Sequence, residues 1–197
     1  MYIPSDPKVW TEIGRDPLLR KPRFWLPALG AALIAFGMPD NIFEKLPFLA
    51  VIVNIISDAI PSVDIWTQRS SFPNITQLLF AYCWMIMPLY AYVVATHKPY
   101  EQAFLSKWLG RKQWIRNLKP ILLILIWISF FLLFYYIALP VDTACSRMCI
   151  HESKLLQGFY GLFFSIGGGS ICGAVFWWLK NFKFIHLTKF HKSGGVQ

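Results

Sequence analysis

The chain has 197 residues, of which 56% are hydrophobic, 17% aromatic and only 15% charged. Because a soluble domain carries about 25% charged residues, this composition excludes an ordinary soluble protein and predicts a membrane protein. The length suits one helical bundle and leaves no room for a sizeable soluble domain. The net charge of +9 would fit a nucleic-acid-binding protein, but the positions of the basic residues suggest another explanation, given below.

The chain begins with a polar segment, residues 1–23, whose mixed charge and length are unlike those of a cleaved secretory signal. We expect it to be a cytoplasmic tail. The apolar run that follows is short for a membrane span, so we expect a kinked continuation through Pro39 that gives a first span over 24–43. Small residues on one face of this span favour close helix packing: Ala28, Ala31, Ala32 and Ala35.

Residues 44–75 are expected to form an outer segment. Its apolar stretch FLAVIVNIISDAI has 13 residues, a length typical of interfacial or re-entrant segments. Asn54, Ser57 and Asp58 lie at i, i+3 and i+4, so a helix here has one narrow polar stripe. We predict an amphipathic helix over about 46–60 that lies at the membrane surface or against the bundle.

Two further apolar runs predict spans over 76–96 and 120–139. Pro88 should kink the earlier one. The later one is bulky all round and is expected to face lipid. Between them lies the basic loop 97–119.

The fourth apolar run, LLQGFYGLFFSIGGGSICGAVFWWL, predicts a span over 154–179 without a charged side chain after its first residue. Small residues recur in it at four-residue spacing: Gly161, Ser165, Gly169 and Gly173. Within lipid such a face favours close approach of another helix. Three interpretations stay open, namely a packing seam within one chain, a homo-oligomer seam, and a hinge or pore lining. We also expect the protein to form a homo-oligomer. We expect the first and fourth spans to form the close-packed centre.

These segments together predict a single all-α domain, a polytopic membrane protein with four transmembrane helices and one interfacial or re-entrant amphipathic helix between spans one and two. An outer loop, 140–153, and a basic cytoplasmic tail, 180–197, complete the chain.

The basic residues predict the orientation. With four spans, one side holds fifteen of the nineteen Lys and Arg residues, and the other holds Lys45, Arg69, Arg147 and Lys154. The positive-inside rule then places both termini in the cytoplasm, whereas a five-span arrangement would put the basic loop outside. Basic residues beside span ends bind anionic headgroups or an acidic cytosolic protein, and no nucleic-acid-binding motif is present. The residues expected to make such contacts are Lys107, Arg111, Lys112, Arg116, Lys119, Lys180 and Lys183.

Cys145 and Cys149 stand in the outer loop, with His151 just after them. Four-residue spacing on a helical turn brings two cysteines within about 6 Å, which suits a disulfide in an oxidising compartment. Free thiols and a Cys-Cys-His metal site are the alternatives, although a metal site would need a fourth ligand.

Catalytic chemistry is not indicated. No main span holds a charged residue in its interior, as ion or proton transport usually requires, and no nucleophile with its base, metal cluster or phosphate loop is evident. We therefore expect no enzyme activity and no cofactor.

The first hypothesis is a non-enzymatic, multi-pass protein of the bacterial inner membrane, an anchor or sensor that engages a cytosolic partner through its basic cytoplasmic face. In topology it is similar to small membrane immunity proteins and to membrane subunits of phage-defence systems, which suggests bacterial defence or toxin immunity. The alternative is a small homo-oligomeric channel or transporter-like pore packed through the fourth span.

Overall fold

The computed structural model describes residues 18–98, 112–137 and 152–182, and the regular structure in these ranges is entirely helical. Three of the helices are long and apolar enough to cross a membrane, namely α6, α8 continued to Tyr135, and α9. This confirms the predicted fold class, an all-helical polytopic membrane protein. The long helices are α2 (Pro22–Gly37), α6 (Pro73–Thr96), α8 (Gln113–Phe131) and α9 (Lys154–Lys180).

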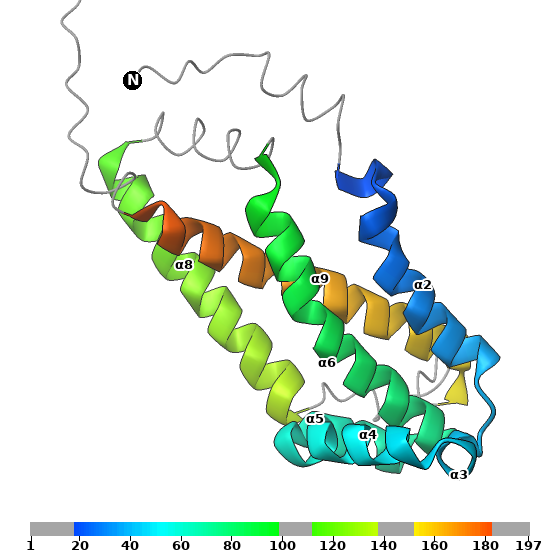
Figure 1. Ribbon diagram of the computed structural model, residues 1–197. Helices are drawn as coiled ribbons and strands as arrows, with labels where there is room; N and C mark the ends of the chain where they lie inside the picture. The colour runs from blue at the N-terminus through cyan, green and yellow to red at the C-terminus, as the bar shows by residue number, and fades with distance from the viewer. Residues whose placement is uncertain (1–17, 99–111, 138–151, 183–197) are drawn as a thin grey trace, which may run out of the picture.

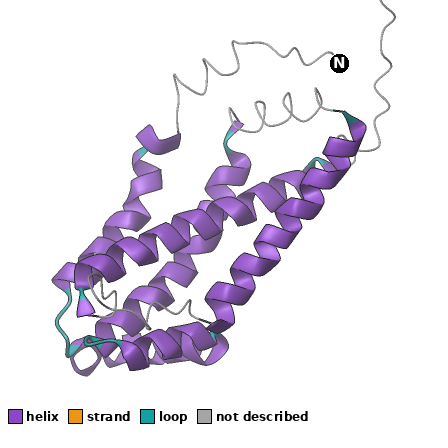
Figure 2. Ribbon diagram, turned by 180° about the vertical axis from the view of Figure 1, so that it is seen from behind, coloured by secondary structure: helices purple, strands orange, loops and turns teal. Residues whose placement is uncertain are grey.

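The four long helices run up and down between two ends of the molecule (Figure 1). At one end the short helices lie across the bundle, and the view from behind shows the same layer (Figure 2). They are α3 (Ile42–Lys45), α4 (Pro47–Ala59) and α5 (Pro61–Arg69). We call this the α3–α5 end. The chain order makes α6 and α9 parallel, because both start there and run to the opposite end.

The first helix is shorter than predicted. α2 ends at Gly37, and Met38 is extended, with φ −86° and ψ 137°. Met38 precedes Pro39, whose ring disfavours helical backbone in the residue before it. The expected kinked span over 24–43 is therefore replaced by a 16-residue helix, a break and the separate turn α3. At about 1.5 Å per residue α2 is about 24 Å long, which is less than the hydrocarbon thickness of about 30 Å.

The amphipathic helix predicted over about 46–60 is present as α4, but the sequence interpretation does not include α5 after it. Ile60 is extended, Pro61 begins α5, and the two helix axes differ by 112°. Pro47, Pro61 and Pro73 each stand at the start of a helix, where a missing N–H costs no hydrogen bond.

The closest helix pair differs from the expected one. α9 packs against α2, α6 and α8, and its most extensive contact is with α6. The second and fourth long helices therefore form the centre, instead of the first and fourth. α8 is almost wholly unburied within the chain, in accord with the lipid-facing position expected for it. It continues into the π-helical turn η2 (Leu132–Ile137) at the α3–α5 end.

Candidate functional site

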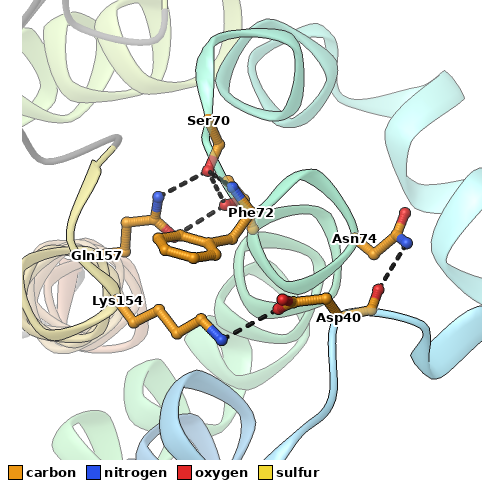
Figure 3. A network of polar contacts seen from close by, with 7 residues as sticks. Asp40, Ser70, Phe72, Asn74, Lys154 and Gln157 are labelled. Atoms are coloured by element: carbon orange, nitrogen blue, oxygen red, sulfur yellow. Dashed lines mark hydrogen bonds and ion pairs between the residues drawn. The ribbon is translucent and has the colours of Figure 1, made fainter.

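A polar cluster joins the starts of α6 and α9 at the α3–α5 end (Figure 3). Thr76 and Gln157 are fully buried, and Thr76 Oγ1 lies 2.8 Å from Gln157 Oε1. Gln157 Nε2 donates to Ser70 Oγ at 2.8 Å, and Thr76 Oγ1 lies 2.6 Å from the same oxygen. Three side chains from three different segments thus form one closed ring.

The protons of this ring can be assigned. A hydroxyl carries one proton, and an amide oxygen only accepts. The ring therefore closes when Thr76 donates to Gln157 Oε1 and Ser70 donates to Thr76. Ser70 Oγ also accepts the backbone N–H of Phe72 at 3.0 Å, which fixes the turn between α5 and α6. Because every polar atom named here has a partner, the cluster stabilises the junction at a place where an unpaired amide would be costly.

A second set of contacts ties the break after α2 to the same junction. Lys154 Nζ lies 3.0 Å from Asp40 Oδ1 and 4.6 Å from the centroid of the Phe72 ring. Asn74 Nδ2 donates to the backbone oxygen of Asp40 at 2.7 Å. The Asp40 side chain is mostly exposed, so these contacts orient the loop more than they stabilise it. Neither set contains an activated nucleophile. Their hydrogen bonds and ion pair hold the helix starts and the adjoining loop together.

The small residues predicted on the fourth span face α6. A methyl carbon built on Gly161 would lie 2.8 Å from Cys83 Sγ, and one built on Gly173 would lie 2.8 Å from the carbonyl oxygen of Ala91. Ser165 is fully buried, and its hydroxyl oxygen lies 2.8 Å from the carbonyl oxygen of Gly161 and 3.2 Å from that of Cys83, so the two carbonyls share its one proton. Because the helices are parallel, each step of four residues along α9 meets a position about one turn further along α6.

Gly169 is the tightest point of this seam. A methyl carbon there would collide with Tyr90 Cβ and lie 2.9 Å from the carbonyl oxygen of Met87. Gly167, two residues earlier, has nothing within 4 Å of the same position. The glycines of the GGG run are therefore not equivalent.

The alanine face of α2 lies inward. Ala31 and Ala35 are fully buried and Ala28 is nearly so, whereas Ala32 is half-buried. Ala35 lies in contact range of α9, because a methyl carbon on Gly158 would lie 3.4 Å from Ala35 Cβ. α2 packs about equally on α6 and α9, and Ala31 and Ala35 belong to the core cluster that these helices form.

The charged residues separate between the two ends. All five acidic residues of the described part lie at or beside the α3–α5 end: Asp40, Glu44, Asp58, Asp64 and Glu152. The opposite end, here called the basic end, carries only basic charges in that part: Arg20, Lys21, Arg23, Lys98, Lys112, Arg116, Lys119 and Lys180. Of the predicted contact residues, Lys112, Arg116, Lys119 and Lys180 belong to this end. Lys107, Arg111 and Lys183 lie outside the described residues.

The cysteine predictions concern a part of the chain that is not described. Cys145, Cys149 and His151 lie outside the described residues, so their disulfide, thiol and metal alternatives stay open. Cys83 and Cys172 are buried free thiols, and the indole of Trp127 donates to Cys172 Sγ at 3.4 Å. Within the described ranges no group of three or more His, Cys, Asp or Glu residues is placed to hold a metal ion.

Sequence reasoning did not single out the polar cluster. A signal was available, because Gln157 and Thr76 are polar residues in the first turns of two long, largely apolar helices. Ser70 gave no such signal, since its place depends on the turn between α5 and α6. Comparisons with protein-family models, with curated proteins and with solved structures found no match to this chain.

Proposed function

We propose that this protein is a non-enzymatic membrane anchor or sensor that engages a cytosolic protein partner through its basic end. In this proposal the basic end faces the cytoplasm of a bacterium, the chain lies in the inner membrane, and both termini are cytoplasmic. A place in bacterial defence or toxin immunity is part of the proposal and rests on topology alone.

The observation that carries the proposal is the separation of charge along the bundle. In the described part, the basic end holds no acidic residue, whereas the α3–α5 end holds all the acidic ones. The positive-inside rule assigns the basic end to the cytoplasm. Lys112 stands just before the first turn of α8, position 116 lies within that turn, and Lys180 ends α9, so these basic residues belong to the same end of the bundle. That surface suits an acidic partner and the anionic headgroups around it.

The channel alternative has less support. A pore or homo-oligomer built on the fourth span would need the face of Gly161, Gly169 and Gly173 for a second copy of the chain. In this fold α6 of the same chain covers that face. The small-residue face of α9 is therefore not free to pack against a second copy of the chain.

Native mass spectrometry of the protein, extracted from its own cells in a mild detergent, tests the proposal. We expect a particle that contains the chain and a soluble protein. A variant with Arg23→Glu and Lys112→Glu should still insert but should lose that protein, because two cations of the basic end are reversed. The control, Lys45→Glu with Asn54→Asp, lowers the net charge by three units at the α3–α5 end, against four units in the basic-end variant, and should keep the partner protein.

The outcomes separate clearly. Cysteine accessibility at the two ends must show that neither variant has changed its orientation, since basic residues also set topology. A partner retained by the basic-end variant would overturn the proposal, and so would equal loss in both variants. A homo-oligomer with no second protein would overturn it too, and conductance in reconstituted vesicles would then be measured.

A further inference from the structure

The outward side of α4 is apolar. Four large side chains on it are exposed, namely Val51 at 62%, Ile55 at 63%, Phe48 at 59% and Ile52 at 44%. Residues 48–57 contain no charged residue. A helix that covers the end of a bundle and faces water would carry polar residues on this side. α4 therefore needs an apolar neighbour other than its own bundle.

The rotation of successive residues divides α4 into three arcs. At about 100° per residue, the buried Val53 and Ser57 define the arc that faces the protein. Val51 and Ile55 lie about 160° from Val53 on either side, which is the opposite arc. Asn54 and Asp58, both exposed, lie about 100° and 140° from Val53 on one flank, so Asp58 stands at the edge of the apolar arc. Around the helix, the arc that faces the protein is therefore followed by a polar arc and then by an apolar arc.

The polar flank is turned partly toward the bundle. Gln77 on α6 donates its side-chain amide to Ser57 Oγ at 3.0 Å and lies 3.3 Å from Asn54 Oδ1. These contacts fix the rotation of α4 about its axis. With that rotation fixed, Val51 and Ile55 cannot turn inward, and their exposure is a property of the fold.

The path of the chain also indicates lipid. α4 and α5 joined together are apolar enough to pass as a membrane span, but the bend of 112° between them prevents a straight crossing. The hydroxyl of Tyr135 in η2 donates to the carbonyl oxygen of Ala59, so the turn that continues α8 contacts the bend between α4 and α5. A bent pair of this composition is either a broken span or a re-entrant loop, and both arrangements bring its apolar side chains into contact with lipid.

We propose that lipid acyl chains cover this arc, so that α4 lies in the plane of the membrane interface with Phe48, Val51, Ile52 and Ile55 in the acyl boundary. The three arcs are those an interfacial helix at the edge of a bundle requires, one each for protein, lipid and water. A soluble partner or a second copy would meet the same arc only after displacing lipid. The inference is independent of the proposed function, because it concerns the opposite end of the bundle and holds for either orientation.

Spin labels on single cysteines test this assignment in the full chain, reconstituted in phosphatidylcholine–phosphatidylglycerol vesicles, with the four native cysteines replaced. Labels at Ile55→Cys and, as a second position on the same arc, Val51→Cys should be relaxed by oxygen, which dissolves in the acyl region, and hardly by a water-soluble nickel chelate. Phe163→Cys, at an exposed apolar position on α9, gives the reference for lipid, and Gln68→Cys, exposed on α5, gives the reference for water. Asp58→Cys should match Gln68→Cys.

Each outcome shows whether lipid, water or protein covers the apolar arc of α4. If the labels at Ile55 and Val51 behave like the one at Phe163, the arc contacts lipid. If they respond to the nickel chelate like the label at Gln68, the arc faces water and the proposal fails. If they are shielded from both reagents, a protein surface covers α4, which also overturns the proposal and favours a second copy of the chain.

Discussion

Thr76 on α6 and Gln157 on α9 form a hydrogen bond of 2.8 Å between two fully buried side chains that are 81 residues apart in the sequence. Both stand in the first turn of their helix, and the helices are parallel. The contact therefore fixes which turn of α9 lies beside which turn of α6. Further along, Ser165 donates to the carbonyl oxygen of Cys83, at a separation of 82 residues. Two polar contacts with nearly the same offset thus set one register for the central pair.

The first prediction concerns the energy of this contact. Thr76→Val and Gln157→Met should each lower the free energy of unfolding by about 1–3 kcal/mol, because each leaves buried polar partners unpaired. The double variant should lose less than the sum, with a coupling energy of about 0.5–2 kcal/mol. Unfolding in mixed micelles of mild detergent and dodecyl sulfate measures all three. Gln68→Met, whose side chain bonds Asp64 on an exposed surface, is the control and should change little. Strict additivity would show that the two side chains do not interact.

The second prediction uses two neighbouring glycines. Gly169→Ala should destabilise the fold by about 1–3 kcal/mol, since its methyl group would collide with Tyr90 and force α6 and α9 apart. Gly167→Ala has open space and should be neutral or stabilising by up to about 1 kcal/mol, the difference in helix propensity between the two residues. The same mixed-micelle unfolding measures both variants. Equal effects would contradict the assignment of Gly169 to the seam.

The sequence predicted part of this architecture well. A lack of charge over long apolar runs was sufficient to identify α6, α8 and α9, and the polar stripe of Asn54, Ser57 and Asp58 was sufficient to identify α4. These are local patterns of hydrophobicity. The end of α2 differs from the prediction although its cause, Pro39, is local, because the length that a membrane span requires favours a continued helix at the position where the proline ends it.

The pairing of helices could not be obtained in the same way. Small residues on the first and fourth spans suggested that these two pack together, but small residues show only that a helix can be approached closely. The approaching side chains on α6 are Cys83, Tyr90 and Val94, and α6 carries no comparable small-residue pattern. The ring of Ser70, Thr76 and Gln157 depends on that pairing and on the bend before α5, so no local pattern indicates it.

The third prediction concerns the ion pair of Asp40 and Lys154. Asp40→Asn should cost less than about 1 kcal/mol, because the pair is partly exposed and screened by solvent. Its effect should shrink further at high salt, whereas the effect of Gln157→Met should not change. Unfolding at low and high salt measures both. A loss from Asp40→Asn as large as that from Gln157→Met would show that the ion pair, and not the buried ring, holds the junction.

The last prediction concerns the four cysteines, whose reaction with a maleimide is counted from the mass of the labelled protein. Cys83 and Cys172 are buried in the helix bundle, so an aqueous maleimide should not reach either in the folded protein. If Cys145 and Cys149 form the predicted disulfide, folded protein without reductant takes up no label. Mild reduction should then add two labels, and reduction with denaturation should add four. Two labels without reductant would show that the outer-loop thiols are free. A third label in folded protein would contradict the burial of Cys83 or Cys172, and therefore the packing of the central helices, because a reagent in water reaches those thiols only if the bundle opens.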